Sequence, residues 1–246
     1  MQATHVWNKF HLYGAKIIVL ISAILFLASS AHAQKLRFTR KNNPNYDERK
    51  ITYGFLIGLH TTAYQIKYAD QFVTQDFDTV NSIIPGWTAG FSLGFIVNYR
   101  VTEFVDLRIT PKVAFYEHSL TYRYTNETTN EQRVETTMVE FPLLLKYKSV
   151  RRGNIRMYMV GGIKPGIEAS GKKEIENITS TLEVKQFNFN LEAGFGFDLY
   201  YPLFKFSPEL RFSRGMVDVL DNKTNVFGQP LQRINTNTIT LYLLFQ

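Results

Sequence analysis

The sequence predicts an all-β fold, an eight-stranded antiparallel transmembrane β-barrel with a cleavable N-terminal signal peptide. Three observations support this fold class. The chain starts with the pattern of an export signal, and from Ile51 onward apolar residues fall on alternate positions. The connections between these alternating segments are short and long in turn, as in transmembrane barrels. We therefore expect three parts: a signal peptide at 1–33, a basic periplasmic segment at 34–50 and an outer-membrane barrel at 51–246.

Residues 1–33 have the features of a secretory signal peptide. A basic region precedes an apolar run at 17–27, and residues 31–33, Ala-His-Ala, form a small-residue cleavage site before Gln34. The apolar run is well short of the roughly 20 residues that a membrane-spanning helix needs. We expect this segment to be removed on export. The alternatives are a short buried helix or an uncleaved anchor.

Alternation with period two predicts each strand in turn. In 87–99 every odd position is apolar, while the positions between them are mostly small or polar, and 187–199 repeats this pattern. A helix, with its period of 3.6, would not keep this phase. Weaker copies complete a set of eight predicted strands near residues 51–59, 87–99, 105–115, 139–147, 155–163, 187–199, 204–212 and 239–245.

The connections differ in length on the two sides of the predicted barrel. Short turns are expected at 100–103, 149–154 and 200–203, and long polar loops at 69–85, 118–135, 169–182 and 214–232. In outer-membrane barrels short turns are periplasmic and long loops extracellular. An even strand number also puts the start of the first strand and the end of the last strand on the same side, the periplasmic one.

The strand face opposite the apolar one carries charge. We expect it to line the lumen as compensating ion pairs, because an eight-stranded barrel has room only for its own side chains. Glycines on this face, among them Gly58 and Gly162, indicate close packing inside the barrel. The predicted lumen residues are Asp106, Arg108, Lys112, Glu140, Lys146, Arg156, Lys164, Glu192, Asp198, Lys205, Glu209 and Arg211.

The same alternation would suit a soluble barrel with its apolar face inward. The export signal, the terminal strand with Phe245 next to last and an aromatic girdle near the short turns favour a lipid-facing apolar surface instead. The predicted girdle comprises Tyr53, Tyr99, Phe104, Tyr147, Tyr200, Tyr201, Phe204 and Phe245.

No motif in the chain predicts catalysis. The sequence has no cysteine, which excludes disulfides, thiolate metal sites and cysteine nucleophiles. Two histidines follow the signal peptide: His60, expected to point inward, and His118, expected to start an outer loop. No spacing assembles either with Ser119 or Asp70 into a triad, and two isolated histidines make no metal site. We therefore predict a non-enzymatic protein without catalytic residues, cofactor or metal.

The segment at 34–50 carries most of the mature chain's net positive charge. Six cations face two acids, a net charge of +4. Two interpretations remain open: a solvated leader that keeps the first strand soluble, or a docking strip for an acidic periplasmic partner. The candidate docking residues are Lys35, Arg37, Arg40, Lys41, Arg49 and Lys50. The remaining charge is not clustered, so no nucleic-acid partner is expected, and no small-molecule substrate is identified.

Several blocks of the mature chain carry a family resemblance. The most specific is 140–149, Glu-Phe-Pro-Leu-Leu-Leu-Lys-Tyr-Lys-Ser. The others are 43–47 with 53–55, and 192–198 with 204–210. Together they resemble the PorT/SprT-like outer-membrane proteins of the Bacteroidetes type IX secretion system, in the start of the first strand, the central strand and the sixth and seventh strands.

The resemblance implies a non-enzymatic accessory protein of protein transport. Family members are needed for the export of cargo with C-terminal sorting domains, and in some species for gliding. The implied partners are outer-membrane lipid and other secretion-system proteins. The predicted outer loops, including 125–135, match the family poorly. The alternatives are a generic OmpA-like or porin-like barrel for envelope integrity or adhesion, and an outer-membrane enzyme that depends on His60 or His118.

Overall fold

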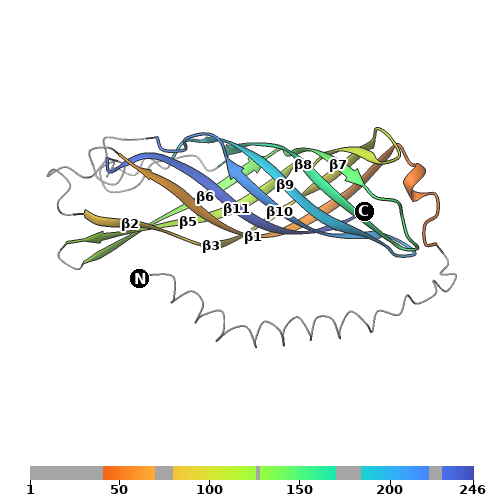
Figure 1. Cartoon of the computed structure of the whole chain (residues 1–246), viewed down its shortest axis with the longest axis horizontal. Coiled ribbons are helices and arrows are strands. Elements are labelled where there is room, and N and C mark those ends of the chain that lie inside the picture. The colour runs from red at the N-terminus through yellow and green to blue at the C-terminus, as the bar shows by residue number, and fades with distance from the viewer. Residues whose placement is uncertain (1–40, 70–79, 126–127, 170–183, 222–228) are drawn as a thin grey trace, which may run out of the picture. The chain divides into compact units, whose positions relative to one another are not determined.

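The computed structural model describes residues 41–69, 80–125, 128–169, 184–221 and 229–246, and there it forms a closed antiparallel β-barrel (Figure 1). The predicted signal peptide lies outside the described residues. In the described ranges, no helical segment has the length and hydropathy of a membrane-spanning helix. The elements are η1 (Tyr46–Glu48), β1 (Ile51–Tyr68), β2 (Val80–Gly86), β3 (Thr88–Arg100), β4 (Val105–Ile109), β5 (Lys112–Tyr124), β6 (Thr129–Glu140), β7 (Leu143–Lys148), β8 (Ile155–Glu168), β9 (Phe187–Tyr200), β10 (Lys205–Gly215) and β11 (Leu231–Phe245).

These segments form the eight barrel strands predicted from the sequence. Three barrel strands consist of two segments each: β2 with β3, β4 with β5, and β6 with β7. Two of the breaks contain Pro111 and Pro142, which lack the N–H that a strand ladder needs. The ladder continues across them, because Phe95 N–H donates to the Pro111 carbonyl at 2.9 Å and Thr110 N–H to the Pro142 carbonyl at 3.1 Å.

The first and last strands close the barrel. β1 and β11 pair from Phe55 with Phe245 to Lys67 with Arg233, and β1 also pairs with β3. The remaining neighbours follow chain order around the ring. Closure gives β1 a paired strand on both sides from Phe55 to Thr62. It therefore meets the requirement of a hydrocarbon environment, where every backbone polar group needs a protein partner.

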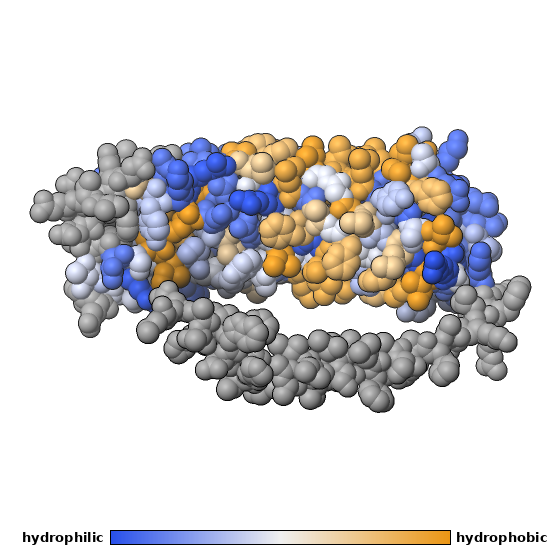
Figure 2. Space-filling model, viewed as in Figure 1, coloured by the Kyte–Doolittle hydropathy of each residue, from blue (hydrophilic) through white to orange (hydrophobic). Residues whose placement is uncertain are grey.

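The two faces of the barrel are arranged as the alternation predicts. Apolar side chains point outward and are exposed, for example Phe95 at 70%, Met159 at 65% and Leu145 at 59%. Figure 2 shows them as a band across the middle of the visible face, with hydrophilic residues at both ends. All twelve predicted lumen charges are buried. The glycines also pack closely, since a Cβ on Gly58 would lie within 2.9 Å of the Tyr242 ring.

The prediction of a long loop at 118–135 is wrong, and so is the start of the last strand at 239. β5 runs to Tyr124, β6 begins at Thr129 and β11 begins at Leu231. The physical reason is that the alternation of apolar and polar residues is reversed at the end of the barrel where the long connections lie. Inward-facing residues there form an apolar cluster, while outward-facing residues such as Arg123 and Glu131 are exposed and charged. The buried members of the cluster are Tyr64, Ile83, Leu120, Tyr122, Val219, Leu220, Leu231 and Ile234.

Candidate functional site

A segment that precedes the first strand lies across one mouth of the barrel. We call residues 42–50 the strap, and the barrel end formed by the short turns at 101–104, 149–154 and 201–204 the short-turn mouth. The strap includes the single 3₁₀ turn η1. It enters that turn through Asn43, whose φ of 46° is tolerated better by asparagine than by most residues.

Side chains of the barrel hold the main chain of the strap. The Asn42 N–H donates to Asn154 Oδ1 at 2.9 Å, and the Asn42 side-chain amide donates to the Tyr200 carbonyl at 3.0 Å. The Arg151 guanidinium donates to the carbonyls of Asn42 and Asn43. The turn at 149–154 therefore binds the main chain of the strap at Asn42 and Asn43, where it bends.

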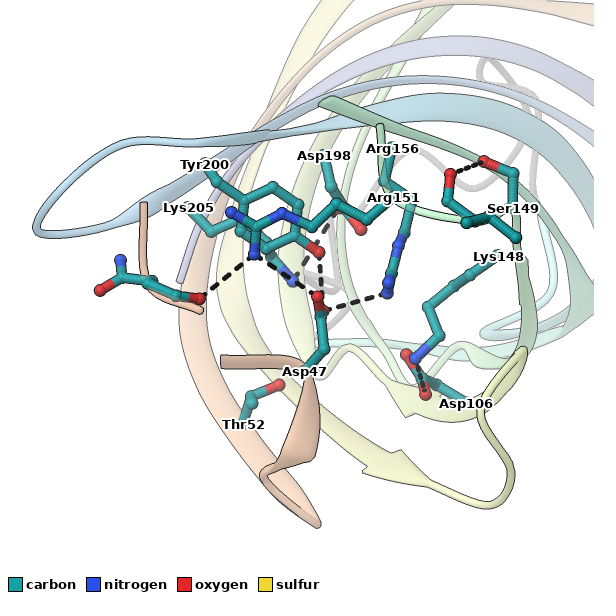
Figure 3. Close-up of polar contacts among 12 residues, drawn as sticks. Asp47, Thr52, Asp106, Lys148, Ser149, Arg151, Arg156, Asp198, Tyr200 and Lys205 are labelled. Atoms are coloured by element: carbon teal, nitrogen blue, oxygen red, sulfur yellow. Dashed lines mark hydrogen bonds and ion pairs between the residues drawn. The ribbon is translucent and has the colours of Figure 1, made fainter. Parts of the chain in front are cut away.

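Asp47 is the electrostatic centre of the strap. Its carboxylate lies 3.0 Å from Arg156 Nη1 and 3.5 Å from Arg151 Nη1, and it accepts a hydrogen bond from the Tyr200 hydroxyl at 2.7 Å (Figure 3). The side chains of Arg151 and Arg156 are only 6% and 9% exposed. Among the described residues, Asp47 is the only carboxylate within ion-pairing distance of either arginine. Removing it would leave two largely buried guanidinium groups without a counter-ion.

Tyr46 supplies the apolar part of the strap's anchorage. Its ring is buried and meets Tyr200 edge to face, with centroids 5.9 Å apart. Lys205 Nζ lies 4.6 Å from the Tyr46 ring centroid. Burial raises the pKa of Tyr46 to about 12, so the phenol stays neutral under physiological conditions. The strap thus presents one neutral ring and one carboxylate to the mouth.

Behind the strap, two lumen carboxylates pair with lysines. Lys148 lies 2.6 Å from Asp106, and Lys205 lies 3.9 Å from Asp198 (Figure 3). Asp198 also lies 2.7 Å from Lys146. The Ser207 hydroxyl also donates to Asp198 at 2.6 Å. These pairs fill the lumen at the level next to the short turns.

A second ion-pair network fills the middle of the barrel. Glu209 bridges Arg108, at 2.6 Å, and Arg211, and Arg211 also lies 3.3 Å from Glu192. Lys112 and Lys164 pair with Glu140 at 3.0 and 3.1 Å, and Lys164 lies 3.5 Å from Glu192. The prediction that lumen charges compensate one another is confirmed.

The structure brings few of the predicted docking residues into contact with the barrel. Lys41, Arg49 and Lys50 are exposed, and the Arg49 guanidinium lies 5.5 Å from the Tyr46 ring centroid. Lys35, Arg37 and Arg40 lie outside the described residues. The docking strip stays a prediction. In the folded barrel Tyr46 and Asp47 contact the mouth. The interpretation of this segment as a solvated leader before assembly also stays a prediction.

Sequence reasoning missed the acid that anchors the strap. Asp47 counted as an offset to the surrounding positive charge and as part of the block at 43–47, and no contact was predicted for it, although a Tyr-Asp pair just before the first strand was a visible signal. Tyr200 is wrongly assigned to the aromatic girdle. It is 3% exposed, since its position on β9 faces the lumen and its hydroxyl binds Asp47. Other predicted girdle residues, including Tyr53 at 68% and Tyr147 at 62%, are exposed.

The histidines lie in the lumen without a catalytic arrangement. His60 is buried as predicted. His118 does not start a loop: it is buried on β5, with Nε2 3.2 Å from Thr62 Oγ1 and its ring stacked on Tyr64. Ser119 follows it on β5 and so points to the other face, while Asp70 lies outside the described residues. Within the described ranges, no group of three potential metal-ligating residues occurs.

A closed barrel with an apolar outer band and an ion-paired lumen defines the class of integral outer-membrane β-barrels. The chain belongs to the family described as outer membrane protein beta-barrel domain, whose sequence profile matches residues 32–221. It is an outer-membrane protein.

Several solved structures are similar to this chain, among them the following two. The outer membrane protein OprG from Pseudomonas aeruginosa has 12% sequence identity and a TM-score of 0.46, over 80% of this chain and 94% of that one. Neisserial surface protein A has 9% identity and a TM-score of 0.40, over 80% of this chain and 98% of that one. No curated protein sequence matches the chain.

Proposed function

We propose that this protein is a non-enzymatic accessory component of the type IX protein secretion system, needed for the export of cargo with C-terminal sorting domains. In this proposal the short-turn mouth and the strap face the periplasm, and the long connections face the exterior. The start of the first strand and the end of the last strand also lie on the periplasmic side. β1 begins and β11 ends at the mouth that the strap covers, which supports this orientation.

The filled interior of the barrel is the observation that best supports an accessory role. Ion pairs occupy the lumen from Asp198 to Glu140, and the strap covers the short-turn mouth. Such a barrel is suited to anchoring contacts in the membrane rather than to passing solutes. We therefore expect no steady conductance from the purified protein in planar bilayers.

The block at 140–149 that resembles the secretion family has a role within the barrel. Glu140, Lys146 and Lys148 supply lumen ion pairs, and Leu145 and Tyr147 face outward. Contacts with other secretion components would then come from the mouth and strap. The exposed cations Lys41, Arg49 and Lys50 suit an acidic periplasmic partner.

Deletion of the gene in the native host tests the proposal. Sorting-domain cargo is fractionated between medium, cell surface and periplasm, and unprocessed cargo should accumulate inside while other outer-membrane proteins stay normal. The deletion strain is then complemented with Lys41→Gln, Arg49→Gln, Lys50→Gln, which should restore export poorly. The matched control is Arg123→Gln, an exposed cation at the far end of the barrel, which should restore it fully.

The alternative is a generic small barrel for envelope integrity or adhesion. It predicts normal cargo at the surface together with increased detergent sensitivity or loss of adhesion. Normal export in the deletion strain would refute the secretion role and leave this alternative.

A further inference from the structure

A groove runs along the strap and reaches the Asp47 carboxylate. The side chain of Asp47 is 24% exposed, whereas those of Arg151 and Arg156 are 6% and 9% exposed. A second chain can therefore approach the ion-paired carboxylate from outside the barrel. The lining residues are Lys41, Pro44, Asp47, Glu103, Phe104, Val150, Arg151 and Arg156.

The strap leaves one of its two arginines, Arg156, incompletely hydrogen-bonded. Arg156 contacts Asp47 through Nη1 at 3.0 Å, and its buried Nε has no hydrogen-bond partner among the described residues. Arg151 is farther from Asp47, at 3.5 Å. Guanidinium groups bind carboxylates most strongly through two parallel hydrogen bonds. Arg156 can thus bind a carboxylate better than it binds Asp47.

Most of the remaining polar contacts between the strap and the mouth involve main-chain atoms of the strap, so they depend little on its sequence. Arg151 donates to two main-chain carbonyls, and Asn154 accepts the main-chain N–H of Asn42. Any peptide chain offers these groups. The mouth therefore recognises main-chain groups followed, a few residues later, by a carboxylate.

We propose that the short-turn mouth is a binding site for an acidic segment of a periplasmic partner protein, and that residues 42–47 occupy this site until the partner displaces them. Charge favours this occupant. The exposed cations Lys41, Arg49 and Lys50 would attract an acidic chain, and Glu103 is the one acid of the groove lining besides Asp47.

This inference rests on the proposed periplasmic orientation of the mouth but not on export of any cargo. Its test measures binding in detergent, so it can fail while the secretion role stands, and the reverse. The probe is a fluorescent peptide with the sequence of residues 42–48, which contains two acids and no cation. The protein is the mature full-length chain purified from outer membranes, with its fold checked by its gel mobility before and after heating.

Fluorescence anisotropy compares the wild type with Asp47→Asn. The apparent dissociation constant equals the intrinsic one divided by the fraction of molecules whose site is open. The wild-type strap keeps that fraction low, so we expect the peptide to bind Asp47→Asn at least about tenfold more tightly than the wild type. Adding Arg156→Gln to Asp47→Asn should abolish this gain, whereas adding Arg123→Gln should not.

A peptide with asparagine in place of its aspartate should bind Asp47→Asn at least about tenfold more weakly, because Arg156 would lose its carboxylate. Equal affinity of the original peptide for the wild type and Asp47→Asn would overturn the proposal, and so would equal affinity of the two peptides for Asp47→Asn. A wild-type dimer that the peptide dissociates would identify the occupant as the strap of a second copy and overturn the assignment to a different protein.

Discussion

Among the lumen residues, we expect the loss of Glu209 to lower the stability of the barrel most. Its carboxylate bridges Arg108, at 2.6 Å, and Arg211, and all three side chains are 0% exposed. In Glu209→Gln the shape is kept but the charge is lost. Arg211 retains Glu192 at 3.3 Å, while Arg108 keeps only the neutral Asn98 oxygen at 2.6 Å among its described polar contacts. One fully buried guanidinium is then left without a counter-ion.

The expected cost follows from that isolated charge. Removing one partner of a buried ion pair destabilises proteins by about 3–5 kcal/mol. We expect a loss of this size for Glu209→Gln. The double variant Arg108→Met, Glu209→Met should lose less stability, because it removes both charges and leaves an apolar pair.

Urea unfolding of the protein in lipid vesicles measures this loss. Trp87 is an intrinsic probe, since it is 60% exposed on the barrel and the other tryptophan lies in the predicted signal peptide. The change in gel mobility on unfolding is the second probe. The matched control is Glu131→Gln on the exposed part of β6, which should leave the unfolding midpoint unchanged. A loss below about 1 kcal/mol in Glu209→Gln would refute the view that Glu209 neutralises buried arginines.

Two further predictions concern packing and the strap. Gly162→Ala should prevent assembly of the folded barrel, because the added Cβ would collide with the Leu143 carbonyl. Gly161→Ala should fold, because the nearest atom to its added Cβ would be 3.8 Å away. The heat-dependent gel shift of outer-membrane fractions distinguishes the two variants. Asp47→Asn removes charged hydrogen bonds worth about 1.5–3 kcal/mol, so trypsin should cleave after Arg49 or Lys50 at least about tenfold faster than in the wild type. Unchanged cleavage in Asp47→Asn, or equally fast cleavage in Glu48→Gln, would contradict the role assigned to Asp47.

The sequence predicted the membrane part of the barrel well, because lipid imposes a strict pattern. Side chains alternate between hydrocarbon and lumen, so Phe95 and Glu209 could be assigned to opposite faces by position alone. The pattern was misread where the barrel leaves the apolar band. There Leu120 and Tyr122 face inward and the outward residues are polar, which reverses the periodicity and made 118–135 resemble a loop.

The candidate site was predicted only in part. The charge of residues 34–50 drew attention to the right segment, but to its cations rather than to its acid. The partners of Asp47 lie more than a hundred positions away, at Arg151, Arg156 and Tyr200. No local pattern links them, since their proximity depends on the turn between β7 and β8, the end of β9 and the start of β1 meeting at one mouth.

The sequence by itself determined the strand number, the short turns and the faces of the membrane strands, since each follows from local periodicity in a fixed environment. Only the tertiary structure decided which charges pair, where the long strands end and what covers the mouth. These properties depend on closure, which brings β1 beside β11 and places Glu209 within reach of Arg108. The ion pair between Asp47 and Arg156 exists because the same closure sets the strap across the ring of turns.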